Sequence, residues 1–128
     1  MSGVVADTST WIHFLAGNAA PRLDDALAHA AVVLPPIVVA ELVSGAIRAR
    51  DRRAIVGLLS QIPLHSTPLD HWLRVGELRR SLRSRGLSVS TPDAHVAQCA
   101  LDREALLLSR DGIFERIARL TRLRVAPG

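Results

Sequence analysis

Four carboxylates stand where apolar segments end, and this recurrence restricts the fold more than any other feature of the chain. Asp7 follows Gly-Val-Val-Ala, and Glu41 follows Ile-Val-Val-Ala. Asp93 comes after Ser-Thr-Pro, and Asp111 comes after Leu-Leu-Leu-Ser-Arg. In an open α/β sheet, ligands bind in the crevice beyond the carboxyl ends of the strands. Acids brought to that edge from distant segments would form an acidic pocket.

Short β-branched runs alternate with stretches of helical periodicity, which indicates a parallel sheet with right-handed crossovers. No linker or repeat divides the 128 residues, so we expect one domain over 1–128, a three-layer α/β/α sandwich. Thr91 and Asp51 are the expected N-caps of two helices. The predicted strands are 4–6, 32–34, 64–66, 106–108 and 123–126. The predicted helices are 8–16, one from Pro21, 37–48, 51–61, 69–85, 91–104 and 113–120.

The chemistry expected of clustered carboxylates is metal binding. Two carboxylates about 5 Å apart repel by roughly 3 kcal/mol at an effective dielectric of 20. A group of four must therefore take up protons or hold a cation, and hard oxygen ligands favour Mg²⁺ or Mn²⁺. Glu41 lies among valines and leucines, so we expect it to be buried and compensated by an arginine or a metal.

Each acid also has an ordinary structural interpretation. Asp7 could cap a helix, and Asp93 could interact with a helix dipole from the first turn. Asp111 could start a turn with Gly112, and Glu41 could form a structural salt bridge. The joint occurrence of all four is more specific than any one of them.

All sixteen basic residues are arginine, and lysine is absent. This excludes lysine-dependent phosphate loops, Schiff-base chemistry and receiver-type sites that pair an aspartate with a lysine. A net charge of +4 together with clustered acids indicates an acidic pocket surrounded by basic residues, an arrangement that favours binding of a polyanion. Solvated helix faces account for most of the arginines. They group at positions 48, 50, 52 and 53, at 74, 79, 80, 83 and 85, and at 116, 119, 122 and 124.

Other chemistries have little support in the sequence. The five histidines form no His-x-His or His-Glu-x-x-His pattern, so no zinc site is predicted. Cys99, the single cysteine, is interpreted as a buried structural thiol in a reducing compartment. No apolar stretch reaches the ~20 residues of a membrane span and no signal segment is evident, so we expect a cytoplasmic protein. The aromatic residues, at helical spacing, are expected in the core: Trp11, Phe14, Trp72 and Phe114.

Four motifs together resemble a known family. They are Asp-Thr-Ser-Thr-Trp-Ile from Asp7, Ala-Glu-Leu-Val-Ser-Gly-Ala around Glu41, Pro-Asp-Ala-His-Val-Ala around Asp93, and Leu-Leu-Ser-Arg-Asp-Gly-Ile-Phe around Asp111. In this order and over the whole chain, they resemble PIN domains. Within that family they are most similar to the VapC-type ribonuclease toxins of prokaryotic type II toxin–antitoxin pairs.

The resemblance implies a five-stranded parallel sheet in the order 3-2-1-4-5 and a pocket that binds Mg²⁺ or Mn²⁺. It also implies endoribonuclease activity, homodimers and inhibition by a cognate antitoxin. Asp7, Glu41, Asp93 and Asp111 match the family's acidic positions, and Ser9 matches its small hydroxyl position. One residue departs from the pattern. Ile113 stands where family members often carry a further acid, so metal coordination from that loop would rest on Asp111 alone.

Asp7 and Asp93 are the expected direct metal ligands, with Glu41 and Asp111 completing the shell or Glu41 acting as a base. A second hypothesis is a catalytically inactive PIN-fold module that binds RNA or protein, which the change at Ile113 favours. A third, a phosphatase or receiver-like domain with a phospho-acceptor at Asp7, is disfavoured by the missing lysine. Apolar residues around Trp11 and Leu15, and on the helix from Leu69, are expected to form the antitoxin groove.

Overall fold

The computed structural model describes residues 3–46 and 48–128. At its centre, three parallel strands form a sheet in the order β1-β2-β3. They are β1 (Val4–Ala6), β2 (Leu106–Leu108) and β3 (Arg124–Ala126). Ala6 pairs with Leu108, and Leu108 with Ala126, so the three strands end level with one another. Residues that follow β1 and β2 therefore emerge at the same edge.

The expected five strands are not all formed, since the described residues contain three. Segments 32–34 and 64–66 join through isolated parallel bridges only, Val4 to Val32 and Leu34 to Leu64. In the expected order 3-2-1-4-5, the segment 32–34 is the second strand of the chain and lies beside β1, and the segment 64–66 is the third and lies at the edge; the two bridges occur between these neighbours. Proline has no backbone N–H, so Pro35 and Pro63, which flank these segments, prevent a longer ladder.

Seven helices are present among the described residues. The predicted helix over 37–48 ends earlier, at Gly45, and its position 47 lies outside the described residues. The others match their predicted places within a few residues. Their bounds are α1 Thr8–Leu15, α2 Pro21–Ala28, α3 Pro36–Gly45, α4 Ala49–Leu59, α5 Leu69–Ser84, α6 Thr91–Arg103 and α7 Gly112–Leu120.

Two predicted helix caps are wrong. Ser90, not Thr91, is the N-cap of α6, and its hydroxyl accepts a hydrogen bond from the backbone N–H of Asp93. Helix α4 begins at Ala49, so Asp51 lies in its first turn and does not cap it. A serine one position earlier satisfies the same backbone donors, and the sequence alone does not distinguish the two registers.

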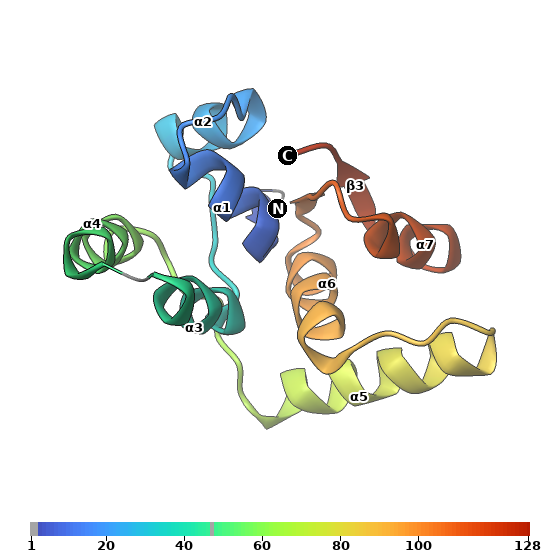
Figure 1. The fold of residues 1–128 in the computed structure, drawn as a ribbon. Helices are drawn as coiled ribbons and strands as arrows, with labels where there is room; N and C mark the ends of the chain where they lie inside the picture. Colours follow the sequence, from blue (N-terminus) through green and yellow to red (C-terminus); the bar gives the residue numbers. More distant parts are fainter. Residues whose placement is uncertain (1–2, 47) are drawn as a thin grey trace.

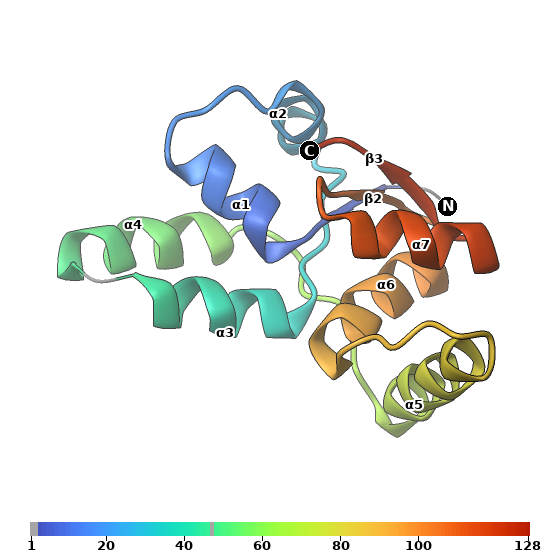
Figure 2. The same cartoon turned by 45° about the vertical axis from the view of Figure 1, so that its right-hand side comes forward.

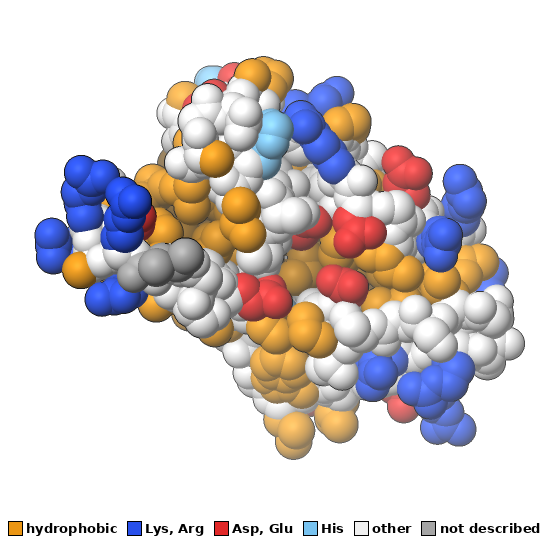
Figure 3. Space-filling model, in the orientation of Figure 1, with side chains coloured by type: hydrophobic (Ala, Val, Ile, Leu, Met, Phe, Trp, Pro, Cys, Tyr) orange, Lys and Arg blue, Asp and Glu red, His pale blue; other side chains and the backbone are white. Residues whose placement is uncertain are grey.

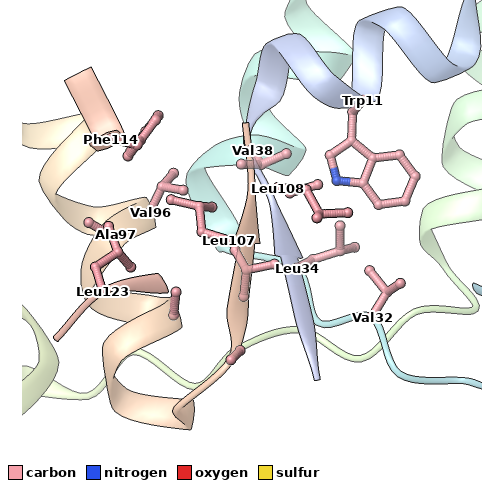
Figure 4. Packing of buried hydrophobic residues seen from close by; sticks show 14 of the residues in the cluster. Trp11, Val32, Leu34, Val38, Val96, Ala97, Leu107, Leu108, Phe114 and Leu123 are labelled. Atoms are coloured by element: carbon pink, nitrogen blue, oxygen red, sulfur yellow. The ribbon is translucent and has the colours of Figure 1, made fainter. Parts of the chain in front are cut away.

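The hydrophobic core lies on both sides of the strands. Figure 4 shows Phe114 and helix α6 on one side and Trp11 from α1 on the other. Trp11, Phe114 and Leu107 are almost completely buried. Trp72 is the exception among the aromatic residues, because it is 40% exposed on α5. Its prediction as a core residue is wrong.

The outer helices form two groups. Helices α3 and α4 lie side by side at one end of the molecule, and α5 lies at the other, where it packs mainly on α6 (Figures 1 and 2). Helix α6 thus separates α5 from the sheet. No described helix is long and apolar enough to cross a membrane.

Candidate active site

All four predicted acids line one pocket. Its volume is about 240 Å³, and its walls come from the start of α1, the middle of α3, the first turns of α6 and the start of α7. Figure 3 shows acidic side chains gathered around a hollow in this region, with arginines farther out over α4 and on the opposite side. The lining residues are Asp7, Thr8, Ser9, Ile12, Glu41, Pro92, Asp93, Val96 and Asp111.

Asp7 is the most firmly held of these acids. It directly follows β1 and is only 5% exposed. As N-cap of α1 it accepts a hydrogen bond from the Thr10 backbone N–H at 2.9 Å on Oδ1. Its Oδ2 accepts hydrogen bonds from Ser109 Oγ at 2.6 Å and from Ser9 Oγ at 3.1 Å. This carboxylate is therefore fixed in orientation before any ligand arrives.

Glu41 lies at the exposed side of the pocket. The expectation that it is buried is wrong, because α3 turns this position away from the core, which it contacts through Val38 and Leu42. Its Oε1 accepts a 2.6 Å hydrogen bond from Thr8 Oγ1. The Glu41 carboxylate is thus held by a hydroxyl and has no arginine partner among the described residues.

The pKa of Asp93 is affected by the other acids of the pocket. It lies half-buried in the first turn of α6. Burial raises its pKa above the ordinary aspartate value, and the charges of Asp111, Asp7 and Glu41 raise it further, although the interaction with Ser90 opposes them. A nearby negative charge disfavours ionisation of a carboxyl group. The contribution of the other three acids to the pKa of Asp93 therefore indicates that the four lie close enough to interact.

Asp111 is the N-cap of α7, where its Oδ1 accepts a hydrogen bond from the Ile113 backbone N–H at 3.1 Å. Its own N–H donates to Ser109 Oγ at 3.0 Å. Ile113 is partly buried and packs against the core. The position at which the resemblance leads one to expect a further acid is therefore used for packing.

Ser109 has a role in the site that was not predicted from the sequence. This buried residue follows β2, donates to Asp7 and accepts from the Asp111 backbone, so it joins the ends of two strands. The signal was its place between a strand and an acid.

The arginines do not neutralise this pocket. In the part of the chain that the structure describes, no ion pair joins an arginine to any of the four acids. Arg74 pairs instead with Asp102 at 2.9 Å, and Arg110 donates to the Gly128 carbonyl at 2.8 Å. The four carboxylates therefore have no arginine partner among the described residues.

A family model described as "PIN domain" matches residues 4–120. The chain belongs to the PIN domain family. The match spans all four acids of the pocket, and the predicted resemblance to PIN domains is confirmed. No curated protein matches the sequence.

Solved structures share the fold of this PIN domain over its whole length. VapBC2 from Rickettsia felis, bound to a DNA fragment from the promoter, is 19% identical, with a TM-score of 0.79, over 100% of this chain and 99% of that chain. VapBC-1 from nontypeable Haemophilus influenzae is 21% identical with a TM-score of 0.76, over 99% of this chain and 98% of that chain. VapBC-5 from Mycobacterium tuberculosis, a member of the VapBC family of toxin–antitoxin systems, is 21% identical with a TM-score of 0.71 at the same coverage.

Proposed function

We propose that this PIN domain is a Mg²⁺- or Mn²⁺-dependent endoribonuclease and the toxin of a toxin–antitoxin pair, acting on RNA in the cytoplasm. The observation that carries the proposal is the convergence of Asp7, Glu41, Asp93 and Asp111 on one pocket without an arginine counter-charge. Burial raises the pKa of Asp93, and the charges of the other three acids add to that shift. A divalent cation would offset the repulsion among the carboxylates.

The donor set fits a hard metal ion. The polar side chains of the pocket offer carboxylate and hydroxyl oxygens, and no described histidine or cysteine lines it. Oxygen donors of this kind suit Mg²⁺ and Mn²⁺, and Mg²⁺ commonly uses only one or two carboxylates and keeps several waters. Asp7 and Asp93 would hold the ion, with Glu41 and Asp111 completing its surroundings directly or through water.

A bound Mg²⁺ or Mn²⁺ would acidify a water and stabilise negative charge on the phosphate. The protein's own side chains would orient the acids and accept the proton of the attacking water. Ser109 and the Thr10 N–H fix the Asp7 carboxylate, so no reorganisation is needed when RNA binds. The Glu41 carboxylate, whose Oε1 is held by Thr8, would take the proton of the attacking water on Oε2. Attack on phosphorus breaks its bond to O3′, which takes up a proton from solvent, and this leaves a 3′-hydroxyl and a 5′-phosphate.

Cleavage of total cellular RNA tests the proposal. Purified protein is incubated in Mg²⁺, in Mn²⁺ and in chelator, beside the variant Asp93→Asn. We expect metal-dependent cutting that the variant loses. Asp70→Asn is a matched control, because Asp70 also lies in the first turn of a helix but outside the pocket. Equal cutting by wild type and Asp93→Asn, or cutting that persists in chelator, would contradict the proposal.

The alternative is a PIN module that binds RNA or protein without cutting it. Ile113 favours this alternative, since the loop after β2 offers a single acid to the pocket. Thermal unfolding with and without Mn²⁺ separates the two. A metal-dependent nuclease is stabilised by Mn²⁺, and the stabilisation is lost in Asp93→Asn, whereas an inactive module shows neither effect.

The proposed protein partner is an antitoxin, because structures with this fold include VapBC complexes. The predicted groove around Trp11 is wrong in one respect, since Trp11 is completely buried. Exposed apolar side chains on α1 and α5 remain as the proposed contact surface. They are Ile12, Leu15, Leu69, Trp72 and Leu73.

Co-expression with the product of an adjacent small gene tests this partnership. We expect the two proteins to co-purify and RNA cleavage to stop in the complex. Mass measurement by light scattering, on the isolated chain and on the complex, tests the proposed homodimer. A partner that binds equally well to Leu69→Ser and Leu73→Ser variants would exclude α5 from the contact surface.

A further inference from the structure

A second cluster of metal-binding side chains lies outside the acidic pocket. His65, His71 and Cys99 each offer one ligand atom, and these atoms all lie within 4.8 Å of one another. All three residues are buried. None lines the acidic pocket. The sequence predicted no zinc site because the cluster has no linear motif: its members come from the segment before α5, from α5 and from α6.

The spacing suits a small tetrahedral ion. Zinc binds imidazole nitrogen at about 2.0–2.1 Å and thiolate sulfur at about 2.3 Å, which puts ligand atoms about 3.3–3.6 Å apart. The ligand atoms of His65, His71 and Cys99 lie within 4.8 Å of one another, so their separations would need to shorten by about 1 Å or a little more. Binding would require the three side chains to move closer by this amount.

The His65 ring is the least restrained member of the cluster. Its Nδ1 is buried and has no hydrogen-bond partner among the described residues. Its Nε2 lies 3.6 Å from Asp102 Oδ2. Metal binds the neutral form of imidazole, and Nδ1 is the His65 nitrogen that has no hydrogen bond among the described residues. An ion would provide the partner that this ring lacks.

His71 is oriented as metal-bound histidines commonly are. Its Nδ1 lies 3.1 Å from Asp102 Oδ2, and its Nε2 lies 2.7 Å from His95 Nδ1. A carboxylate on one imidazole nitrogen fixes the tautomer, and the other nitrogen would exchange its hydrogen bond to His95 for the ion. Asp102 is itself held by two hydrogen bonds from Arg74, both at 2.9 Å, and one from Gln98 at 2.8 Å. The histidine is thus supported by a fixed carboxylate.

Cys99 supplies the soft ligand. Its Sγ lies 3.8 Å from His95 Nε2. Burial raises its pKa, so without metal it is a neutral thiol. Metal binding would replace the thiol proton: the S–H bond breaks, the metal–sulfur bond forms, and one proton leaves to solvent for each ion bound.

We propose that His65, His71 and Cys99 bind a zinc-class ion that ties α5 and the segment before it to α6. Helix α5 lies at the edge of the molecule and packs mainly on α6 (Figure 2), so an ion here would fasten an outer helix to the core. Nitrogen and sulfur donors select Zn²⁺ or Co²⁺ over the Mg²⁺ or Mn²⁺ favoured by carboxylates. The inference does not depend on the proposed nuclease activity.

Cobalt absorption tests this site directly. Tag-free protein, stripped with chelator, is titrated with Co²⁺ in the presence of excess Mg²⁺, which competes for the acidic pocket. We expect a sulfur-to-cobalt charge-transfer band in the near ultraviolet that saturates near one equivalent and is displaced by Zn²⁺. Because Cys99 is the only cysteine, such a band has one possible source. A wild-type titration without the band overturns the proposal, whatever the variants do.

Three variants place the ion. Cys99→Ser is expected to lose the band, and His65→Gln to weaken Co²⁺ binding at least tenfold, with circular dichroism showing that both are folded. Asp93→Asn, altered in the acidic pocket alone, is expected to keep the band. A band that survives in Cys99→Ser, or that disappears in Asp93→Asn, contradicts the assignment. RNA cleavage is not the readout, so failure of the nuclease proposal leaves this result interpretable.

Discussion

Ser109 Oγ donates a 2.6 Å hydrogen bond to Asp7 Oδ2, although the two residues are 102 positions apart in the sequence. Each follows a strand, and β1 and β2 end level with each other, which brings the hydroxyl to the carboxylate. The same Oγ accepts from the Asp111 backbone N–H at 3.0 Å. One buried serine therefore positions two acids of the pocket.

Replacing Ser109 with alanine is expected to weaken Mn²⁺ binding and RNA cleavage by roughly 10–100-fold, the usual cost of removing a support behind a metal ligand. Two hydrogen bonds are lost, one of them to a carboxylate, at a cost of about 2–4 kcal/mol. The fold should survive, because a domain is typically stable by about 5–15 kcal/mol. Mn²⁺ titration and cleavage rates measure the effect. Ser84→Ala is the control, since Ser84 bonds only to a helix carbonyl on exposed α5. Unchanged Mn²⁺ affinity in Ser109→Ala would rule out the positioning role.

Asp93→Asn is expected to stabilise the metal-free protein at neutral pH while abolishing cleavage. The pKa of Asp93 is raised by burial and by the other acids, so the folded state favours the protonated form. Its contribution to stability is complete below the unfolded pKa of 3.8 and is lost as pH rises through the higher folded pKa. The gain should be below about 1 kcal/mol, because the group is partly solvated.

Urea unfolding in chelator at several pH values measures this gain. The stability of wild type should fall relative to Asp93→Asn as the pH rises above 4, and Mn²⁺ should reverse the order of the two proteins at neutral pH. A variant that is less stable than wild type in chelator at neutral pH would contradict the expectation that the ionised Asp93 carboxylate destabilises the metal-free fold.

Asp102→Asn is expected to destabilise the fold by about 2–3 kcal/mol at pH 7, because hydrogen bonds to a charged group are lost. Burial by itself would raise the pKa of Asp102, but hydrogen bonds from Arg74, Gln98 and His71 outweigh it and hold that pKa well below the usual value. This stabilisation is present above the unfolded pKa of 3.8 and is lost as pH falls through the folded pKa.

The free energies of unfolding of wild type and Asp102→Asn, measured from pH 7 down through pH 3, test whether the stabilisation by Asp102 decreases as the pH falls. The difference should shrink only below about pH 4. Asp70→Asn, on the exposed first turn of α5, should show no comparable loss. A difference that is constant with pH would mean that the ionised carboxylate contributes nothing.

The arginines of α4 are expected to contact RNA phosphates, because α4 packs beside α3, which carries Glu41. Arginines cover this end of the molecule in Figure 3. Replacing Arg52 and Arg53 with glutamine should reduce the salt dependence of RNA binding by about 1.4 in log–log slope, from about 0.7 for each phosphate contact. Binding is measured in the Asp93→Asn background, so that RNA stays intact. The comparison pair, Arg80 and Arg83 on α5, should leave the slope unchanged; equal effects of both pairs would show nonspecific attraction.

Sequence periodicity located the helices and the three regular strands to within a few residues, because these patterns reflect local backbone preference and one-sided burial. Asp7 and Asp111 were predictable members of a shared edge, since parallel strands end together. The segments 32–34 and 64–66 were predicted as full strands but form only isolated bridges. This could not be predicted, because Pro35 and Pro63 limit pairing with neighbours that the sequence does not identify.

The sequence by itself determined the order of the elements, the acids at their ends and the family. Only the tertiary structure decided that Glu41 faces solvent, that Trp72 is exposed, that Ser109 supports Asp7, and that His65, His71 and Cys99 meet. The physical reason is that conformation along a helix or strand follows from nearby residues, whereas side-chain contacts between elements depend on how those elements cross. A shift of one helical turn between α5 and α6 would separate His71 from Cys99 without changing any local pattern.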